Sequence, residues 1–265
     1  MSQLNTAETE GMLEVDTSGS VATVALNRVE KRNALNLPII KALHETFANL
    51  PDHVRVVILH GHGPHFSAGL DLSDLTDHST WAGIQHSRAW HAAFDQIQMG
   101  KVPVIAVLHG GVVGGGLELA SSCHIRVAET STYYALPEGQ RGIFVGGGGA
   151  VRLPRLIGAA RMADMMLTGR TYDADEGKII GFSQYVVPEG QGMAKARELA
   201  ERIASNAPLS NFAIIHALPR IADQSHSDGL FTEALMAAIA QADDAAKERL
   251  NAFLQGKAAK ALRKS

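Results

Sequence analysis

Residues 104–120 read VIAVLHGGVVGGGLELA, and this stretch decides the fold that the sequence predicts. Its first five residues are apolar and rich in β-branched side chains, which is typical of a buried strand. Residues 117–123 have the apolar character of a buried helix, and a run of glycines separates the two. A strand followed by a helix in this way indicates an α/β core.

Outward from this stretch, the same alternation of strands and helices continues. Residues 21–26 and 54–59 are further strand candidates, and residues 37–50 and 80–99 have apolar side chains at helical spacing. Alternating strands and helices predict parallel strand pairing. The strands that end at His60-Gly61 and His109-Gly110 resemble each other, which suggests that one structural unit is used more than once.

The glycine triplet at residues 114–116 has two interpretations. Free N–H groups at the start of a helix carry partial positive charge, so they can hold an anion or a developing oxyanion. Alternatively, the glycines are a hinge that lets strand and helix pack tightly. A dinucleotide site is disfavoured, because the spacing is not G-x-G-x-x-G and no acidic residue ends a suitable second strand.

Two glutamates lie in apolar surroundings. Glu118 interrupts the apolar helix of residues 117–123, and Glu138 follows Leu136 and Pro137 in a loop. A buried carboxylate is costly unless it is paired or functional, so each is either an ion-pair or capping residue or a catalytic group. Two carboxyl groups in unequal environments are what acid/base chemistry at neutral pH requires.

Composition narrows the class of protein. The chain has 265 residues, 46% hydrophobic, and a formal net charge of −3, which argues against a nucleic-acid binder. A single cysteine, Cys123, excludes an intramolecular disulfide, and its apolar neighbours favour a buried structural thiol. We expect a soluble, cytoplasmic protein, because neither a signal or transit peptide nor a membrane span is recognisable.

After Gly146 the sequence is almost wholly helical. Helices are expected at residues 147–157, 160–167, 174–180, 193–204, 209–221 and 230–254, with one short strand at residues 184–187. The segment 230–254 is apolar on more than one face, which predicts that it is buried. It is buried either against other subunits or within its own chain.

Four segments together resemble the enoyl-CoA hydratase/isomerase (crotonase) superfamily. They are FSAGLD at residues 66–71, GGGLELA at 114–120, PEG at 137–139 and GGGG at 146–149, and the similarity runs from about residue 15 to residue 253. The resemblance implies an α/β fold: a crotonase-like spiral of β-β-α units over residues 1–205. It also implies a helical oligomerisation region over residues 206–265, forming a homotrimer or a hexamer built as a dimer of trimers.

The same resemblance implies the reaction and its residues. Glu118 and Glu138 match the two catalytic carboxylates, and the backbone amides of Leu70 and Gly115 match the oxyanion hole. We therefore expect a hydratase that adds water to C2=C3 of a short or medium 2-enoyl-CoA, with Glu118 as base and Glu138 as acid. Such an enzyme needs no cofactor and no metal, because coenzyme A is part of its substrate.

Coenzyme A contacts are also implied by the resemblance. The backbone around Ala68 and Leu70 is expected to meet the adenine, Lys31 or Arg32 the phosphates, and a C-terminal lysine the distal phosphate. The expected set is Lys31, Arg32, Ala34, Ala68, Leu70, Asp71 and Lys257.

The sequence departs from the family pattern beside the second glutamate. Gly139 and Val145 replace the residues that hydratases often carry there, which predicts an altered pocket floor and acyl specificity. Alternative activities are an enoyl-CoA isomerase that uses Glu138 alone, or hydration with thioester hydrolysis of a substituted short acyl group, such as a thioether-substituted acryloyl. A non-catalytic RNA-associating protein is disfavoured by the negative charge and the glutamate pair.

Several side chains have competing structural interpretations. Trp81, Trp90 and Phe94 either shape the acyl tunnel or belong to the core of the helix at residues 80–99. His60 and His109 end strands with no second ligand at metal-site spacing, which favours structural roles.

Overall fold

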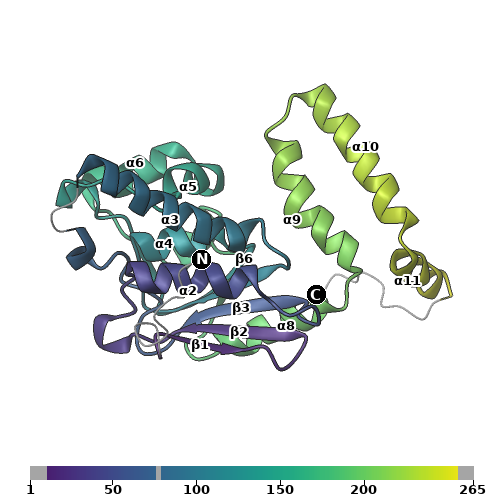
Figure 1. The fold of residues 1–265 in the computed structure, drawn as a ribbon, viewed down its shortest axis with the longest axis horizontal. Coiled ribbons are helices and arrows are strands. Elements are labelled where there is room, and N and C mark those ends of the chain that lie inside the picture. The colour runs from purple at the N-terminus through teal and green to yellow at the C-terminus, as the bar shows by residue number, and fades with distance from the viewer. Residues whose placement is uncertain (1–10, 76–78, 256–265) are drawn as a thin grey trace. The chain divides into compact units, whose positions relative to one another are not determined.

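A computed structural model describes residues 11–75 and 79–255 of the chain. These residues divide into two compact units, with the division between Ala204 and Ser205. The first unit contains the sheets and most of the helices, and the second is wholly helical (Figure 1).

The first unit is built on a six-stranded sheet with the order β1-β2-β3-β4-β6-β9. Only the β1–β2 pair is antiparallel, and the other neighbours are parallel. The predicted α/β class with parallel pairing is therefore confirmed. The strands are β1 Leu13–Asp16, β2 Val21–Leu26, β3 Val56–Gly61, β4 Val104–Leu108, β6 Ile125–Glu129 and β9 Tyr185–Val187.

A second, three-stranded sheet has the order β5-β7-β8, formed by Gly111–Val113, Tyr133–Ala135 and Tyr172–Asp173. The chain leaves β4 through a sharp turn at Gly110, where a Cβ would lie 2.0 Å from the carbonyl oxygen of Pro64. It therefore forms β5 before the helix begins. The sequence analysis did not predict this short strand, which lies between β4 and the helix.

Helices cover both faces of the larger sheet (Figure 1). Val56, Ile58 and Ile105 point to the face covered by Ala196 and Leu199 of α8. Val57, Leu59 and Ala106 point to the opposite face, where they join the main core. The helices of this unit are α2 Leu37–Ala48, α3 Thr80–Gln98, α4 Gly115–Ser122, α5 Gly149–Ile157, α6 Ala159–Thr168, α7 Ala174–Ile179 and α8 Gly192–Ala204, with 3-10 turns η1 Val29–Lys31, η2 Leu72–Leu75 and η3 Gly139–Arg141.

The second unit consists of α9 Pro208–Ala222, α10 His226–Ala242 and α11 Asp244–Leu254. The single helix expected over residues 230–254 is wrong. Asp243 is extended (φ −66°, ψ 135°) and its carboxylate accepts a 3.2 Å hydrogen bond from the amide of Ala246. An aspartate in this conformation ends one helix and caps the next.

Helix α10 exposes large apolar side chains along its length. Leu230, Phe231, Leu235 and Ile239 are all at least half exposed, and Phe231 reaches 68%. The expectation that this segment is buried, either against other subunits or within its own chain, stays a prediction. Separately, among residues 11–75 and 79–255, no helix is long and apolar enough to cross a bilayer.

Candidate active site

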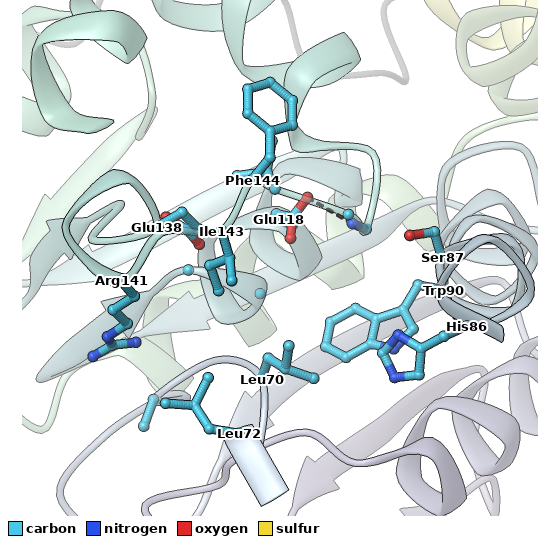
Figure 2. A pocket seen from close by; sticks show the side chains of 17 residues that line it. Leu70, Leu72, His86, Ser87, Trp90, Glu118, Glu138, Arg141, Ile143 and Phe144 are labelled. Carbon is cyan, nitrogen blue, oxygen red and sulfur yellow. Dashed lines mark hydrogen bonds between the residues drawn. The ribbon is translucent and has the colours of Figure 1, made fainter. Parts of the chain in front are cut away.

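A cavity of about 230 Å³ in the first unit is lined by several of the residues that the sequence predicts to be functional. Ala68, Leu70, Gly115, Glu118 and Glu138 all line it, although they come from separate segments of the chain (Figure 2). The remaining lining residues are Leu72, Gly83, His86, Ser87, Trp90, Gly114, Arg141, Ile143, Phe144, Val145, Gly146 and Gly147.

Glu118 lies on the fully buried helix α4, and only 3% of the surface of Glu118 is exposed. Its Oε1 accepts hydrogen bonds of 2.8 Å from the amides of both Gly147 and Gly149. A Cβ at residue 149 would lie 2.8 Å from the same oxygen, so only glycine lets this backbone approach so closely. The glycine run at residues 146–149 is therefore a cradle for a carboxylate.

Burial raises the pKa of Glu118, because desolvation disfavours its charged form. The amides of Gly149, Gly147 and Gly146 and the charge of Arg152 act in the opposite direction and lower that pKa. These four partners favour an ionised Glu118, which is the state that a general base needs.

Arg152 anchors the glycine cradle from behind. Its Nη1 donates to the carbonyl of Gly147 at 3.0 Å, Nη2 donates to Asp95 at 2.7 Å, and Nε donates to Gln98 at 2.6 Å. The guanidinium therefore connects α3 to the loop whose amides hold Glu118. Sequence reasoning missed this role, since nothing in the pattern around residue 152 links it to residue 118.

Glu138 lies between β7 and the 3-10 turn η3, directly before the first residue of that turn. It is 6% exposed, and within the described residues its Oε2 has no hydrogen-bond partner. Burial, and secondarily the negative charge of Glu118, raise the pKa of Glu138 to about 7. Its carboxyl group is therefore disposed to hold a proton near neutral pH and to act as a general acid.

Two backbone amides complete the cavity wall. Leu35 bonds to Gly69 and Asp71, on either side of Leu70, so the Leu70 amide faces away from that pairing. Gly115 is the first residue of α4, and in the described part of the chain neither its amide nor that of Leu70 makes a hydrogen bond. A Cβ at Gly115 would lie 3.2 Å from the nitrogen of Leu70, so the two donors lie close together. This is an arrangement that can bind an oxyanion.

Only some of the residues expected to contact coenzyme A line the cavity. Ala68 lines the cavity, and its amide donates to the carbonyl of Arg32 at 2.9 Å, which joins the two segments. Lys31 and Arg32 are exposed outside the cavity, and Ala34 is buried beside them. Lys257 lies outside the described residues.

Asp71 is occupied by an ion pair. Its carboxylate accepts a 2.6 Å hydrogen bond from Arg28, whose guanidinium also bonds to the carbonyl of Ala34. Hydrogen bonds from Ser73 and Arg28 lower the pKa of Asp71 to about 2. The side chain of Asp71 therefore ties the loop together.

Gly139 does not shape the cavity floor, and that prediction is wrong. The cavity lining does not include it, and a Cβ at residue 139 would lie 2.2 Å from the carbonyl oxygen of Met166. The glycine therefore allows η3 to pack against α6. Val145, the other departure, does line the cavity.

The aromatic residues of α3 divide between the two interpretations. Trp90 both lines the cavity and belongs to the core, Phe94 is core only, and Trp81 is 68% exposed. His86 and Ser87 also line the cavity, and sequence reasoning missed them because a helical face gives no sign of which cavity it meets.

The remaining candidates have structural surroundings. Cys123 is buried, and burial raises the pKa of its thiol to about 12. His109 bonds through Nε2 to the carbonyl of Gly63 at 2.9 Å. Over residues 11–75 and 79–255, no group of three or more His, Cys, Asp or Glu side chains is arranged to hold a metal.

The sequence of this chain is similar to those of known proteins. The sequence model of the family described as Enoyl-CoA hydratase/isomerase matches residues 16–260. A short-chain-enoyl-CoA hydratase of Clostridium acetobutylicum is 35% identical, over 74% of this chain and 76% of its own. The enoyl-CoA hydratase EchA19 of Mycobacterium tuberculosis is 31% identical, over 92% of this chain and 94% of its own.

Solved structures share the fold. A crystal structure of a Rhodopseudomonas palustris protein, assigned as a candidate enoyl-CoA hydratase, is 59% identical to this chain with a TM-score of 0.90. The similarity covers 93% of this chain and 95% of that protein.

Proposed function

The chain belongs to the enoyl-CoA hydratase/isomerase family, and we propose that it adds water across C2=C3 of a short or medium 2-enoyl-CoA. One observation carries this proposal. Glu118 and Glu138 face one cavity from different environments, one held by backbone amides and the other with an unpartnered carboxyl oxygen among the described residues. Hydration needs both a base and an acid, and these environments supply one of each.

In the proposed mechanism, ionised Glu118 removes a proton from a water molecule as the oxygen of that water bonds to C3. The π electrons move toward the thioester, whose oxygen becomes an enolate bound by the amides of Leu70 and Gly115. Glu138 then donates its proton to C2, which completes the addition of water. Each oxyanion donor of this kind contributes roughly 10²–10³ in rate.

The family resemblance indicates which residues contact the coenzyme A part of the substrate. Coenzyme A is part of the substrate rather than a separate cofactor, with its adenine at the backbone of Ala68 and Leu70 and its phosphates near Lys31 or Arg32. The basic tail around Lys257 is a further candidate contact. We propose that the apolar faces of α9 and α10 form contacts in a homotrimer or hexamer, because many large side chains on them are exposed.

Loss of the enoyl-thioester absorbance of crotonyl-CoA tests the function. Glu118→Gln and Glu138→Gln should each lower kcat by roughly 10²–10⁴ while the thioester still binds. Glu189→Gln is the matched control, because Glu189 is exposed and lies outside the cavity. Full activity in Glu118→Gln with a 3-enoyl-CoA would instead identify an isomerase with a single proton shuttle.

A further inference from the structure

One wall of the cavity carries polar groups that the proposed hydration does not use. Helix α3 contributes Gly83, His86, Ser87 and Trp90, whose spacing of i, i+3, i+4 and i+7 places them on a single helical face. The wall therefore has a hydroxyl, an imidazole and an indole where a purely aliphatic acyl group would require only apolar contacts.

Two of these groups have no hydrogen-bond partner among residues 11–75 and 79–255. The Ser87 hydroxyl makes no hydrogen bond to any described residue, not even to a carbonyl of the preceding helical turn. The Trp90 indole N–H is buried and likewise has no partner among the described residues. The Ser87 hydroxyl is half-buried on the cavity wall, so the acceptor within its reach is a ligand or a water molecule in the cavity. The Trp90 N–H lies beneath the surface, because the benzene edge of the indole is the edge that faces Gly115 and Gly147.

The position of Ser87 fixes which part of the substrate it would meet. A Cβ at Gly146 would lie 3.0 Å from the Ser87 hydroxyl oxygen, and the next residue, Gly147, binds Glu118. Figure 2 shows the hydroxyl turned toward the side of the cavity where Glu118 lies. Since Glu118 activates the water that attacks C3, Ser87 faces the first carbon atoms beyond C3.

We propose that Ser87 binds a neutral oxygen on the acyl chain. The preferred substrates would be short 2-enoyl-CoA thioesters with a hydroxyl group near C4. A carboxylate at this place is disfavoured, because ionised Glu118 lies on the same side of the cavity and would repel a second buried negative charge. This inference rests on the proposed hydratase function and names its substrate class.

The test compares kcat/KM for 4-hydroxy-2-pentenoyl-CoA and 2-pentenoyl-CoA, which differ by one oxygen atom. The wild type should favour the hydroxylated thioester roughly tenfold or more, the effect of about one hydrogen bond. Ser87→Ala should bring this ratio close to one. Gln85→Ala is the control on the same helix, since Gln85 is exposed and outside the cavity.

Other outcomes would overturn the subsite. Equal or greater preference for 2-pentenoyl-CoA by the wild type contradicts it, and so does preference for the carboxylated 2-pentenedioyl-CoA. A fall in kcat of Ser87→Ala that is the same for both pentenoyl thioesters would show that Ser87 holds the attacking water instead.

Failure of the hydratase function gives a different result. If no enoyl-CoA is hydrated, the binding of the same two thioesters can still be measured by calorimetry. Tighter binding of the hydroxylated thioester that is lost in Ser87→Ala would then support the subsite alone, and equal affinities would contradict it. If the enzyme is active, Glu118→Gln provides the low-turnover background for the same titration.

Discussion

The carboxylate of Glu138 lies directly against the backbone of Gly114. A Cβ at residue 114 would be 2.7 Å from Oε1 of Glu138, and Gly114 has a φ of +52° that side chains rarely adopt. The amide of Gly114 also donates to the carbonyl of Ala135 at 2.9 Å, at the end of the strand that leads to Glu138. The glycine therefore restricts where the carboxyl group of Glu138 can lie.

Gly114→Ala should consequently impair catalysis as well as stability. The new methyl group would push Glu138 out of line with C2, and misplacement of a catalytic group by about 1 Å costs roughly 10² in rate. Crotonyl-CoA turnover and thermal melting measure the two effects. Gly190→Ala is the matched control, because Gly190 also has a positive φ, at +77°, but has no atom within 4 Å of its Cβ position. Equal kcat losses in the two variants would contradict a specific contact with Glu138.

The pH dependence of kcat/KM follows from the two carboxyl groups. Glu138 must be protonated to act as acid, and burial raises its pKa to about 7, so activity should fall as the pH rises above about 7. Glu118 must be ionised to act as base, and its raised pKa should place the acid limb above the ordinary carboxyl range. The two limbs belong to the pair, because the groups are coupled. Rates of crotonyl-CoA hydration between pH 4 and 10 measure both; a profile flat across neutrality would contradict these assignments.

The carboxyl group of Glu138 also makes the stability of the folded protein depend on pH. The folded-state pKa of Glu138 lies above its ordinary value of 4.5, so its protonated form is favoured in the folded protein. Glu138 therefore adds to the free energy of unfolding below about pH 4.5, and this added stability is lost as the pH rises through about 7. Glu138→Gln should therefore be more stable than the wild type at pH 8, by at most about 3 kcal/mol.

Denaturant unfolding of both proteins at pH 4 and pH 8 measures this difference. The advantage of the variant should disappear at pH 4, where the wild-type carboxyl group is protonated in both states. A difference of the same size at both pH values would show that the amide, and not the removed charge, changes stability.

The sequence was most informative where an element is long or uniformly apolar. Strand β2 at Val21–Leu26 and strand β4 at Val104–Leu108 were predicted to the residue, because both are apolar runs next to clear breaks. The three-residue strands β5 and β7 were missed, since such short segments carry no periodicity. The interruption at Asp243 was missed because the alanine-rich pattern on both sides favours helix.

In the candidate site, too, some residues could be predicted from the sequence and others could not. Glu118 and Glu138 were recognisable as carboxyl groups in apolar surroundings, and the resemblance added Leu70 and Gly115. No sequence pattern indicates that Gly147 and Gly149 bind Glu118, because these glycines lie 29 and 31 residues away from it along the chain. Ser87 was missed for the same reason: only tertiary folding places α3 opposite the glycine loop.

Arg152 should be a positioning residue for the general base. Its guanidinium bonds to the carbonyl of Gly147, and the amide of Gly147 bonds to Glu118, so its removal frees the loop that orients the base. Arg152→Met should lower kcat roughly tenfold to hundredfold. The positive charge of Arg152 also lowers the pKa of Glu118, so its loss should move the acid limb of the kcat/KM profile to higher pH.

The displaced acid limb separates this role from simple destabilisation, which would lower the melting temperature without moving the limb. Arg152→Lys should restore part of the charge effect but not the three-way hydrogen bonding, because a lysine ammonium lacks the planar fork of arginine. Arg155→Met is the control on the same helix, since the Arg155 side chain is exposed and bonds to Val151 of its own helix. An acid limb at the wild-type position in Arg152→Met would show that Arg152 acts on stability alone.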